Sequence, residues 1–194
     1  MNLINEANEL FLKKKFYDAI AKYEIILESQ PNNLIALNNK GYSFSKLRNY
    51  SKALTCYNEC LEKNPRDKTV LINKISLFRK IGEFDKALEI CENLLKNNSN
   101  EMIVLYHKLR ILKKLDRFSE SNIICKELLN IYPDNGDVLY DMASNFLKMG
   151  DDEKFLVTLE KAVNIIPNLK RKSKNNKEFK QFRNDERFLK IILE

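Results

Sequence analysis

The chain has 194 residues, with 44% hydrophobic and 31% charged side chains and a formal net charge of +7. No run approaches the roughly 18 apolar residues that a membrane span requires, and the first residues lack a basic segment followed by an apolar one. We therefore expect no membrane span, no export signal and a cytoplasmic location. Residues 168–194 hold nine basic and four acidic residues, so most of the excess positive charge lies at the C-terminal end.

Three sets of residues recur at an interval of 34 positions. The sets are leucines, aromatic residues and all four prolines of the chain: Leu3, Leu37, Leu71, Leu105 and Leu139; Phe16, Tyr50, Phe84 and Phe118; Pro31, Pro65, Pro133 and Pro167. Because three independent sets agree in phase, they indicate one structural unit copied about five times.

Within each copy the apolar spacing is that of two helices. In the second copy, small and apolar residues three or four positions apart form a first helix, and a second follows a break at Leu47–Asn49. Pro65 closes the copy because proline disfavours helix in the residue before it. In chain order the pattern predicts helices over 2–14, 17–29, 34–47, 51–63, 68–81, 85–97, 102–114, 119–131, 136–148 and 152–165.

The segment that runs through Leu37, Gly41, Phe44, Tyr50, Ala53, Tyr57 and Pro65 resembles the tetratricopeptide repeat (TPR). The resemblance covers residues 1–167 and implies an all-α, right-handed α-solenoid of about five TPR helical hairpins. The expected repeats are 1–33, 34–67, 68–101, 102–135 and 136–167. Gly41 and Ala53 have little or no side chain, which allows the two helices of a hairpin to approach closely.

Several positions depart from the family pattern. Tryptophan is absent, Ile75 and Leu109 stand where Gly41 stands, and Ser99 replaces the proline. Ser121 and Phe155 replace the alanine, and Asp152 interrupts the aromatic set. We therefore expect the fifth hairpin to pack differently at its outer edge.

Residues 168–194 follow the last repeat and combine a basic stretch, from Lys170 to Lys177, with apolar residues from Phe179 onward. A stack of hairpins needs a terminal element with a polar outer side to cover its last apolar face. We expect capping helices here. The alternative is a functional tail that is independent of the stack.

A polar set on the first helices indicates a binding surface. Helix geometry places Asn39 about 200 degrees from the core residue Leu37, so it points away from the hairpin partner. The same position holds Asn5, Asn73, His107 and Asp141, and Asn8, Tyr42, Ser76, Arg79 and Arg110 are expected nearby. An amide both donates and accepts hydrogen bonds, which suits the backbone of a peptide. The alternative is that these residues are only solvated surface.

In the TPR family, asparagines at this position hold bound peptides by their main chain, so the resemblance implies that role for Asn39 and Asn73. Only Asn8 and Asn39 match the residues with which some family members clamp a carboxyl terminus. The sequence therefore does not predict that particular specificity.

Sequence motifs give little support for catalysis. His107, the only histidine, has no nucleophile or carboxylate placed beside it by a motif, and no glycine-rich phosphate loop is present. The four cysteines, Cys56, Cys60, Cys91 and Cys125, are expected to be small buried residues rather than metal ligands. We expect no enzyme activity, no cofactor and no metal.

The leading hypothesis is a non-enzymatic scaffold that binds an extended peptide segment of a partner protein in the concave TPR groove. The basic and aromatic residues of the groove favour an acidic ligand. The alternative is binding of nucleic acid or of an anionic surface through the segment from Lys170 to Lys180, which a salt titration tests. A protein partner is expected rather than nucleic acid or a membrane, and a monomer is expected, with self-association left open.

Overall fold

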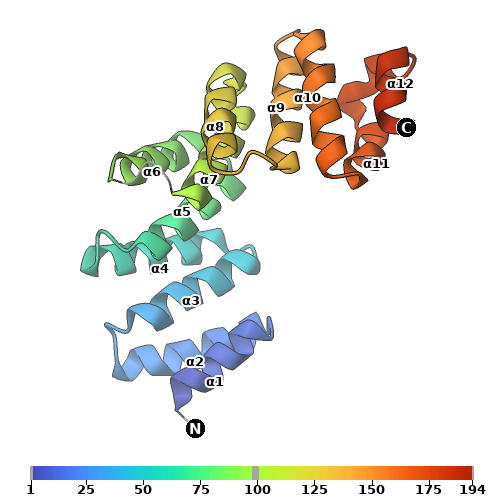
Figure 1. Ribbon diagram of the computed structural model, residues 1–194. Coiled ribbons are helices and arrows are strands. Elements are labelled where there is room, and N and C mark those ends of the chain that lie inside the picture. The colour runs from blue at the N-terminus through green and yellow to red at the C-terminus, as the bar shows by residue number, and fades with distance from the viewer. Residues whose placement is uncertain (1, 98–100, 194) are drawn as a thin grey trace. The chain divides into compact units, whose positions relative to one another are not determined.

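The computed structural model describes residues 2–97 and 101–193, which contain α-helices and one 3-10 helix and no strand. The helices follow one another as α1 (Leu3–Leu12), α2 (Phe16–Ser29), α3 (Leu34–Lys46), α4 (Tyr50–Lys63), α5 (Lys68–Ile81), α6 (Phe84–Asn97), α7 (Met102–Lys114), α8 (Phe118–Ile131), α9 (Gly136–Lys148), α10 (Asp152–Ile165), α11 (Asn168–Asn175), η1 (Lys177–Phe182) and α12 (Glu186–Leu193) (Figure 1). The all-α fold class is confirmed.

The chain divides into two compact units, Met1–Val104 and Leu105–Glu194. In the first unit α1 packs on α2, α3 on α4 and α5 on α6, and successive hairpins touch through α2 with α3 and α4 with α5 (Figure 1). In the second unit α8 packs on α9, α9 on α10, and α10 on α11 and α12. The sequence did not predict this division, and the repeat boundaries stay a prediction.

The ten helices predicted from the apolar spacing are confirmed, with ends that agree within two residues. Side-chain caps explain three of the first-helix starts. Asn33, Asp67 and Asn135 each accept a hydrogen bond from a backbone N–H in the first turn, at 3.0, 3.1 and 3.1 Å. These caps also lie on the interval of 34. Ser99, where proline was missing from the pattern, lies outside the described residues.

The turn inside each hairpin has one residue in the left-handed region. Its φ is 59° at Lys14, 62° at Arg48, 83° at Gly82, 55° at Asp116 and 75° at Gly150. These five positions are again 34 residues apart. Glycine adopts this conformation without strain, whereas Lys14, Arg48 and Asp116 adopt it at a cost of about 1 kcal/mol because their Cβ approaches the following carbonyl oxygen.

In each hairpin a buried position on the first helix is paired with one on the second, and which of the two holds the larger residue differs between hairpins. Gly41 on α3 faces Tyr57 on α4, and a Cβ atom at Gly41 would lie 2.8 Å from the Tyr57 ring. The corresponding pairs on the interval of 34, all buried, are Ala7 with Tyr23, Ile75 with Cys91, Leu109 with Cys125, and Ala143 with Leu159. A small residue on the first helix therefore goes with a large one on the second, and the reverse. This exchange explains why Ile75 and Leu109 replace the glycine of the pattern.

The expected C-terminal cap is present in the second unit. Phe155 on α10 is fully buried, and its ring centroid lies 4.8 Å from those of Phe179 and Phe182 and 6.3 Å from that of Phe188. Arg187 of α12 also forms a two-point ion pair with Glu153, at 2.6 and 2.9 Å. Phe155 replaces the alanine of the pattern because it packs against the cap and not against another hairpin. The different packing predicted for the outer edge of the fifth hairpin thus corresponds to these contacts of Phe155 with the cap.

Candidate functional site

A chain of hydrogen-bonded side chains links the first helices of the N-terminal unit. Asn8 on α1 accepts hydrogen bonds from Tyr23 Oη at 2.8 Å and from Asn39 Nδ2 at 3.2 Å. Asn38 on α3 donates to Asn39 Oδ1 at 3.4 Å and accepts from Asn73 Nδ2 on α5 at 2.9 Å. We call Asn8, Asn38, Asn39 and Asn73 the amide row. It brings three of the predicted site residues together and adds Asn38, which the sequence analysis missed.

The amide row is half-buried, and its members bond to one another through only some of their amide hydrogens. Each amide nitrogen has two hydrogens, and Asn39 and Asn73 each donate one of them within the row. Burial raises the pKa of Tyr23, which keeps its hydroxyl protonated as a donor to Asn8, while the Asn39 side chain opposes that shift. The row can therefore hold its own geometry and still offer donors and acceptors to a peptide backbone.

Beyond the row, the other predicted residues of the N-terminal unit are spread over α1, α3 and α5. Asn5 is exposed, and Ser76 and Arg79 are half-buried. Tyr42 packs against Phe11 with ring centroids 5.2 Å apart, and Lys46 Nζ lies 5.0 Å from the Tyr42 ring. The aromatic and basic character that the sequence predicted for this face is thus present beside the row.

The remaining predicted residues belong to helices of the C-terminal unit. His107 is half-buried and Arg110 is exposed on α7. Asp141 on α9 forms an ion pair with Lys113 at 2.5 Å. This pairing satisfies the Asp141 carboxylate inside the unit.

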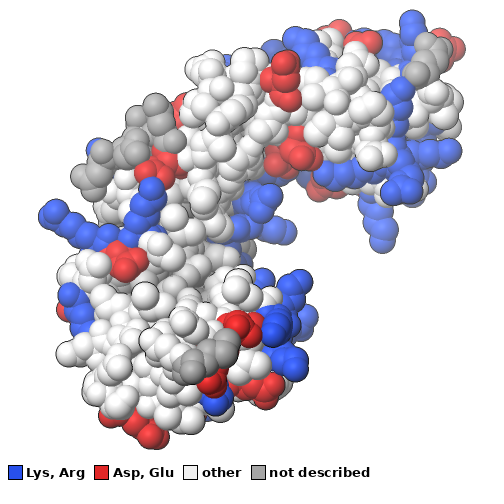
Figure 2. Space-filling view, turned by 60° about the horizontal axis from the view of Figure 1, so that its bottom comes forward, with Lys and Arg blue, Asp and Glu red and all other residues white. Residues whose placement is uncertain are grey.

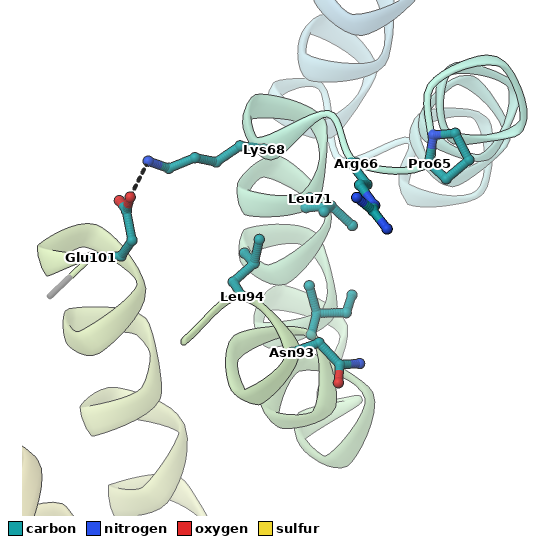
Figure 3. Close-up of a pocket in the computed structure, with 8 residues that line it drawn as sticks. Pro65, Arg66, Lys68, Leu71, Asn93, Leu94 and Glu101 are labelled. Atoms are coloured by element: carbon teal, nitrogen blue, oxygen red, sulfur yellow. Dashed lines mark hydrogen bonds and ion pairs between the residues drawn. The ribbon is translucent and has the colours of Figure 1, made fainter. Parts of the chain in front are cut away.

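A pocket of about 580 Å³ in the N-terminal unit was not predicted. Leu71 of α5 and Ile90 and Leu94 of α6 supply its apolar wall, and Lys68 reaches across to Glu101 in an ion pair of 2.5 Å (Figure 3). Leu71 belongs to the repeated leucine set and is half-buried, as are Leu3 and Leu139 of that set, whereas Leu37 and Leu105 are buried.

The basic C-terminal segment is built into the cap. Leu169 and Ser173 of α11 are buried, and Lys172 Nζ lies 4.1 Å from the ring of Tyr140 on α9. Arg171 and Lys174 are exposed, and Lys170 is half-buried. Binding of nucleic acid or of an anionic surface through this segment stays a prediction.

The described residues hold no group of three or more His, Cys, Asp or Glu side chains that would fit a metal ion. The four cysteines are buried, as expected from the sequence. Burial raises the pKa of Cys56 to about 11 and that of Cys125 to about 12, so these thiols stay neutral at physiological pH. Across residues 2–97 and 101–193, no helix is long and apolar enough to cross a membrane.

Comparisons with known proteins agree with this architecture. The family model of the tetratricopeptide repeat matches residues 35–67. Among solved structures, YrrB, described as "a TPR protein with an unusual peptide-binding site", has 20% sequence identity, a TM-score of 0.72 and coverage of 85% of either chain. A MamA RS-1 ArsTM double mutant has 12% identity and a TM-score of 0.78, with 86% of this chain and 94% of that chain covered.

Another MamA structure covers 95% of this chain and 93% of its own, with 13% identity and a TM-score of 0.74. No curated protein sequence matches the chain. At these identities the solved structures show a shared fold, and the tetratricopeptide repeat model matches the sequence of one hairpin of this chain.

Proposed function

We propose that this protein is a non-enzymatic scaffold whose N-terminal unit binds an extended peptide segment of a partner across α1, α3 and α5. The amide row is the observation that carries the proposal, because it aligns side-chain amides on three successive first helices. The description of YrrB as a peptide-binding TPR protein supports the same use of the fold.

The spacing of the row fits an extended ligand. Packed helices lie about 8–10 Å apart, and an extended chain advances about 3.3 Å per residue. One amide of the row therefore meets roughly every third residue of the peptide. Contacts to the main chain at this spacing tolerate many ligand sequences, since every residue offers the same backbone groups.

Charge beside the row favours an acidic ligand. Lys46 lies over Tyr42, and Lys80 Nζ on α5 donates to Ser45 Oγ on α3 at 2.9 Å. Among the described residues no acidic partner is recorded for either lysine. An acidic side chain of the peptide would be that partner, and the attraction between the two charges would weaken as salt is added.

The test uses a random peptide library displayed on phage, selected on the full chain, followed by titration of the enriched peptides. Removing one uncharged hydrogen bond costs about 0.5–1.5 kcal/mol, so Asn39→Ala with Asn73→Ala should weaken a selected peptide by about ten- to hundredfold. Failure to enrich any peptide, or equal affinity of the double variant, would contradict the proposal.

The row also joins helices, so the double variant needs a control for stability. Asn58→Ala is the matched change: it removes an amide that accepts a hydrogen bond from Lys74 at 2.8 Å, but Asn58 lies on the second helix α4. This variant should retain the peptide affinity of the original chain. Thermal unfolding of both variants identifies the temperature range in which each is folded, and binding is compared only there.

A further inference from the structure

The turn of the first hairpin exposes two large apolar side chains. Leu12 at the end of α1 is 76% exposed, and Tyr17 in the first turn of α2 is 75% exposed. Their neighbours Phe11 and Phe16 turn inward and pack on each other, with ring centroids 6.1 Å apart. Phe11 and Phe16 pack inward, and neighbouring positions on a helix point in different directions. Leu12 and Tyr17 are therefore exposed.

Three lysines lie between these side chains. Lys13, Lys14 and Lys15 are exposed. Lys13 forms an ion pair with Glu9 at 3.2 Å, and among the described residues Lys14 and Lys15 form none. We call Leu12, Lys13, Lys14, Lys15 and Tyr17 the first-turn tip. It combines exposed apolar side chains with positive charge.

The positive charge continues to the next two hairpin turns. Tyr42 contacts Phe11 and carries Lys46 over its ring, and Lys80 is hydrogen-bonded to Ser45 beside Lys46. Burial and the nearby Lys46 both lower the pKa of Lys80, as expected for cations held close together. The α1–α2 turn lies at the right-hand end of α1 in Figure 1, and Lys and Arg side chains gather along that side of the N-terminal unit, with some acidic ones among them, in Figure 2.

We propose that the first-turn tip docks the protein on an anionic membrane surface, with Leu12 and Tyr17 entering the headgroup layer and the lysines contacting acidic lipids. Tyrosine favours this layer because its ring is apolar and its hydroxyl is polar. Each lysine close to such a surface contributes about 1 kcal/mol, or about fivefold in affinity.

A lipid surface suits the tip better than a protein partner does. A specific protein interface buries roughly 800 Å² on each side, whereas a hairpin turn presents a narrow convex surface. A headgroup layer accommodates a narrow protrusion and offers negative charge over a wide area. From the sequence we expected no membrane partner, since no run is long and apolar enough to span one, and surface docking requires no span. The proposal does not require peptide binding by the amide row, and the first-turn tip contains neither Lys46 nor Lys80.

Tryptophan emission tests insertion directly, because the chain contains no tryptophan. The full chain with Tyr17→Trp is mixed with vesicles of phosphatidylcholine containing about 30% phosphatidylserine, and separately with phosphatidylcholine alone. We expect the emission to shift to shorter wavelength with the anionic vesicles only. Tyr132→Trp is the matched reporter, since Tyr132 is 51% exposed at the end of α8, and its emission should not shift. An unchanged Tyr17→Trp spectrum overturns the proposal.

Vesicle sedimentation tests the charges. Lys14→Gln with Lys15→Gln should weaken binding to the anionic vesicles by about thirtyfold. The control Lys126→Gln with Lys161→Gln removes the same charge from exposed positions of α8 and α10 and should bind like the original chain. Equal losses in the two double variants would show attraction by net charge alone and would overturn the assignment to the tip. Binding of mixed-sequence RNA through Lys14 and Lys15, without a shift of the Tyr17→Trp emission on vesicles, would identify a nucleic-acid surface instead.

Discussion

Gly41 on α3 faces Tyr57 on α4. We therefore predict that the effect of adding a methyl group at position 41 on stability depends on the residue at position 57. In Gly41→Ala the new Cβ would lie 2.8 Å from Tyr57 Cε1 and 3.0 Å from both Tyr57 Cδ1 and Cys56 Cβ. These separations are well inside van der Waals contact. The Tyr57 side chain is only 1% exposed and cannot swing into solvent, and Cys56 Cβ moves only with the helix backbone. The hairpin must therefore open to admit the methyl group.

Two opposing effects set the magnitude. Overpacking a core position costs about 1–3 kcal/mol, whereas replacing glycine by alanine inside a helix gains about 1 kcal/mol. We therefore expect Gly41→Ala to lower the free energy of unfolding by about 1 kcal/mol. With Tyr57→Leu present, the hairpin has the alanine–leucine pair found at Ala143 and Leu159. The Tyr57 ring is then absent, and Gly41→Ala should be neutral or stabilising by up to about 1 kcal/mol.

Urea unfolding of the original chain, both single variants and the double variant, followed by circular dichroism, measures the coupling between the two positions. Tyr57→Leu alone should cost less than the about 3–5 kcal/mol of truncating an aromatic side chain to alanine, so all four chains should have measurable transitions. The same effect of Gly41→Ala in both backgrounds would refute the explanation based on the Tyr57 ring.

Three further predictions concern stability. Phe155→Ala removes the ring at the centre of the cap and should cost about 3–5 kcal/mol, and an unchanged urea midpoint would contradict that packing. Arg48→Gly relieves a left-handed residue at φ 62° and should gain about 0.5–1 kcal/mol, seen as a higher Tm; a lower Tm would argue against strain there. Burial raises the pKa of Cys56 to about 11 and that of Cys125 to about 12. Their contribution to stability is therefore complete below the unfolded thiol pKa of about 8.5 and is lost as pH rises towards those folded values, so Tm should fall in alkaline buffer and a flat profile would contradict this.

The fold was largely predictable because its determinants are local. Helix periodicity, the closing prolines and the caps at Asn33, Asp67 and Asn135 act within a few residues and repeat at a fixed interval. The departures from the pattern became interpretable only with the structure. Ser121, which replaces an alanine, accepts a hydrogen bond from the buried Asn145 at 2.9 Å. This bond joins α8 to α9 through two residues that are 24 positions apart in sequence.

The candidate site was predictable in part. Helix geometry predicted that Asn39 and Asn73 share a polar face, because direction around a helix follows from sequence position, and in the structure Asn38 links the two side chains. It missed Asn38, since the bond from Asn73 to Asn38 depends on how neighbouring hairpins are rotated against each other. Leu12 and Tyr17 were missed for the opposite reason: both continue an apolar pattern and look like core residues until the turn exposes them.

The pairing of a large residue with a small one inside each hairpin has an evolutionary consequence. Since Gly41 and Tyr57 are matched within a single module, duplicating or deleting all 34 residues of that module carries both members of the pair together. Recombination within a module would instead separate them and leave either a void or a clash. Lineages of such chains should therefore change length by whole modules, and crossovers that survive should fall in the loops between hairpins.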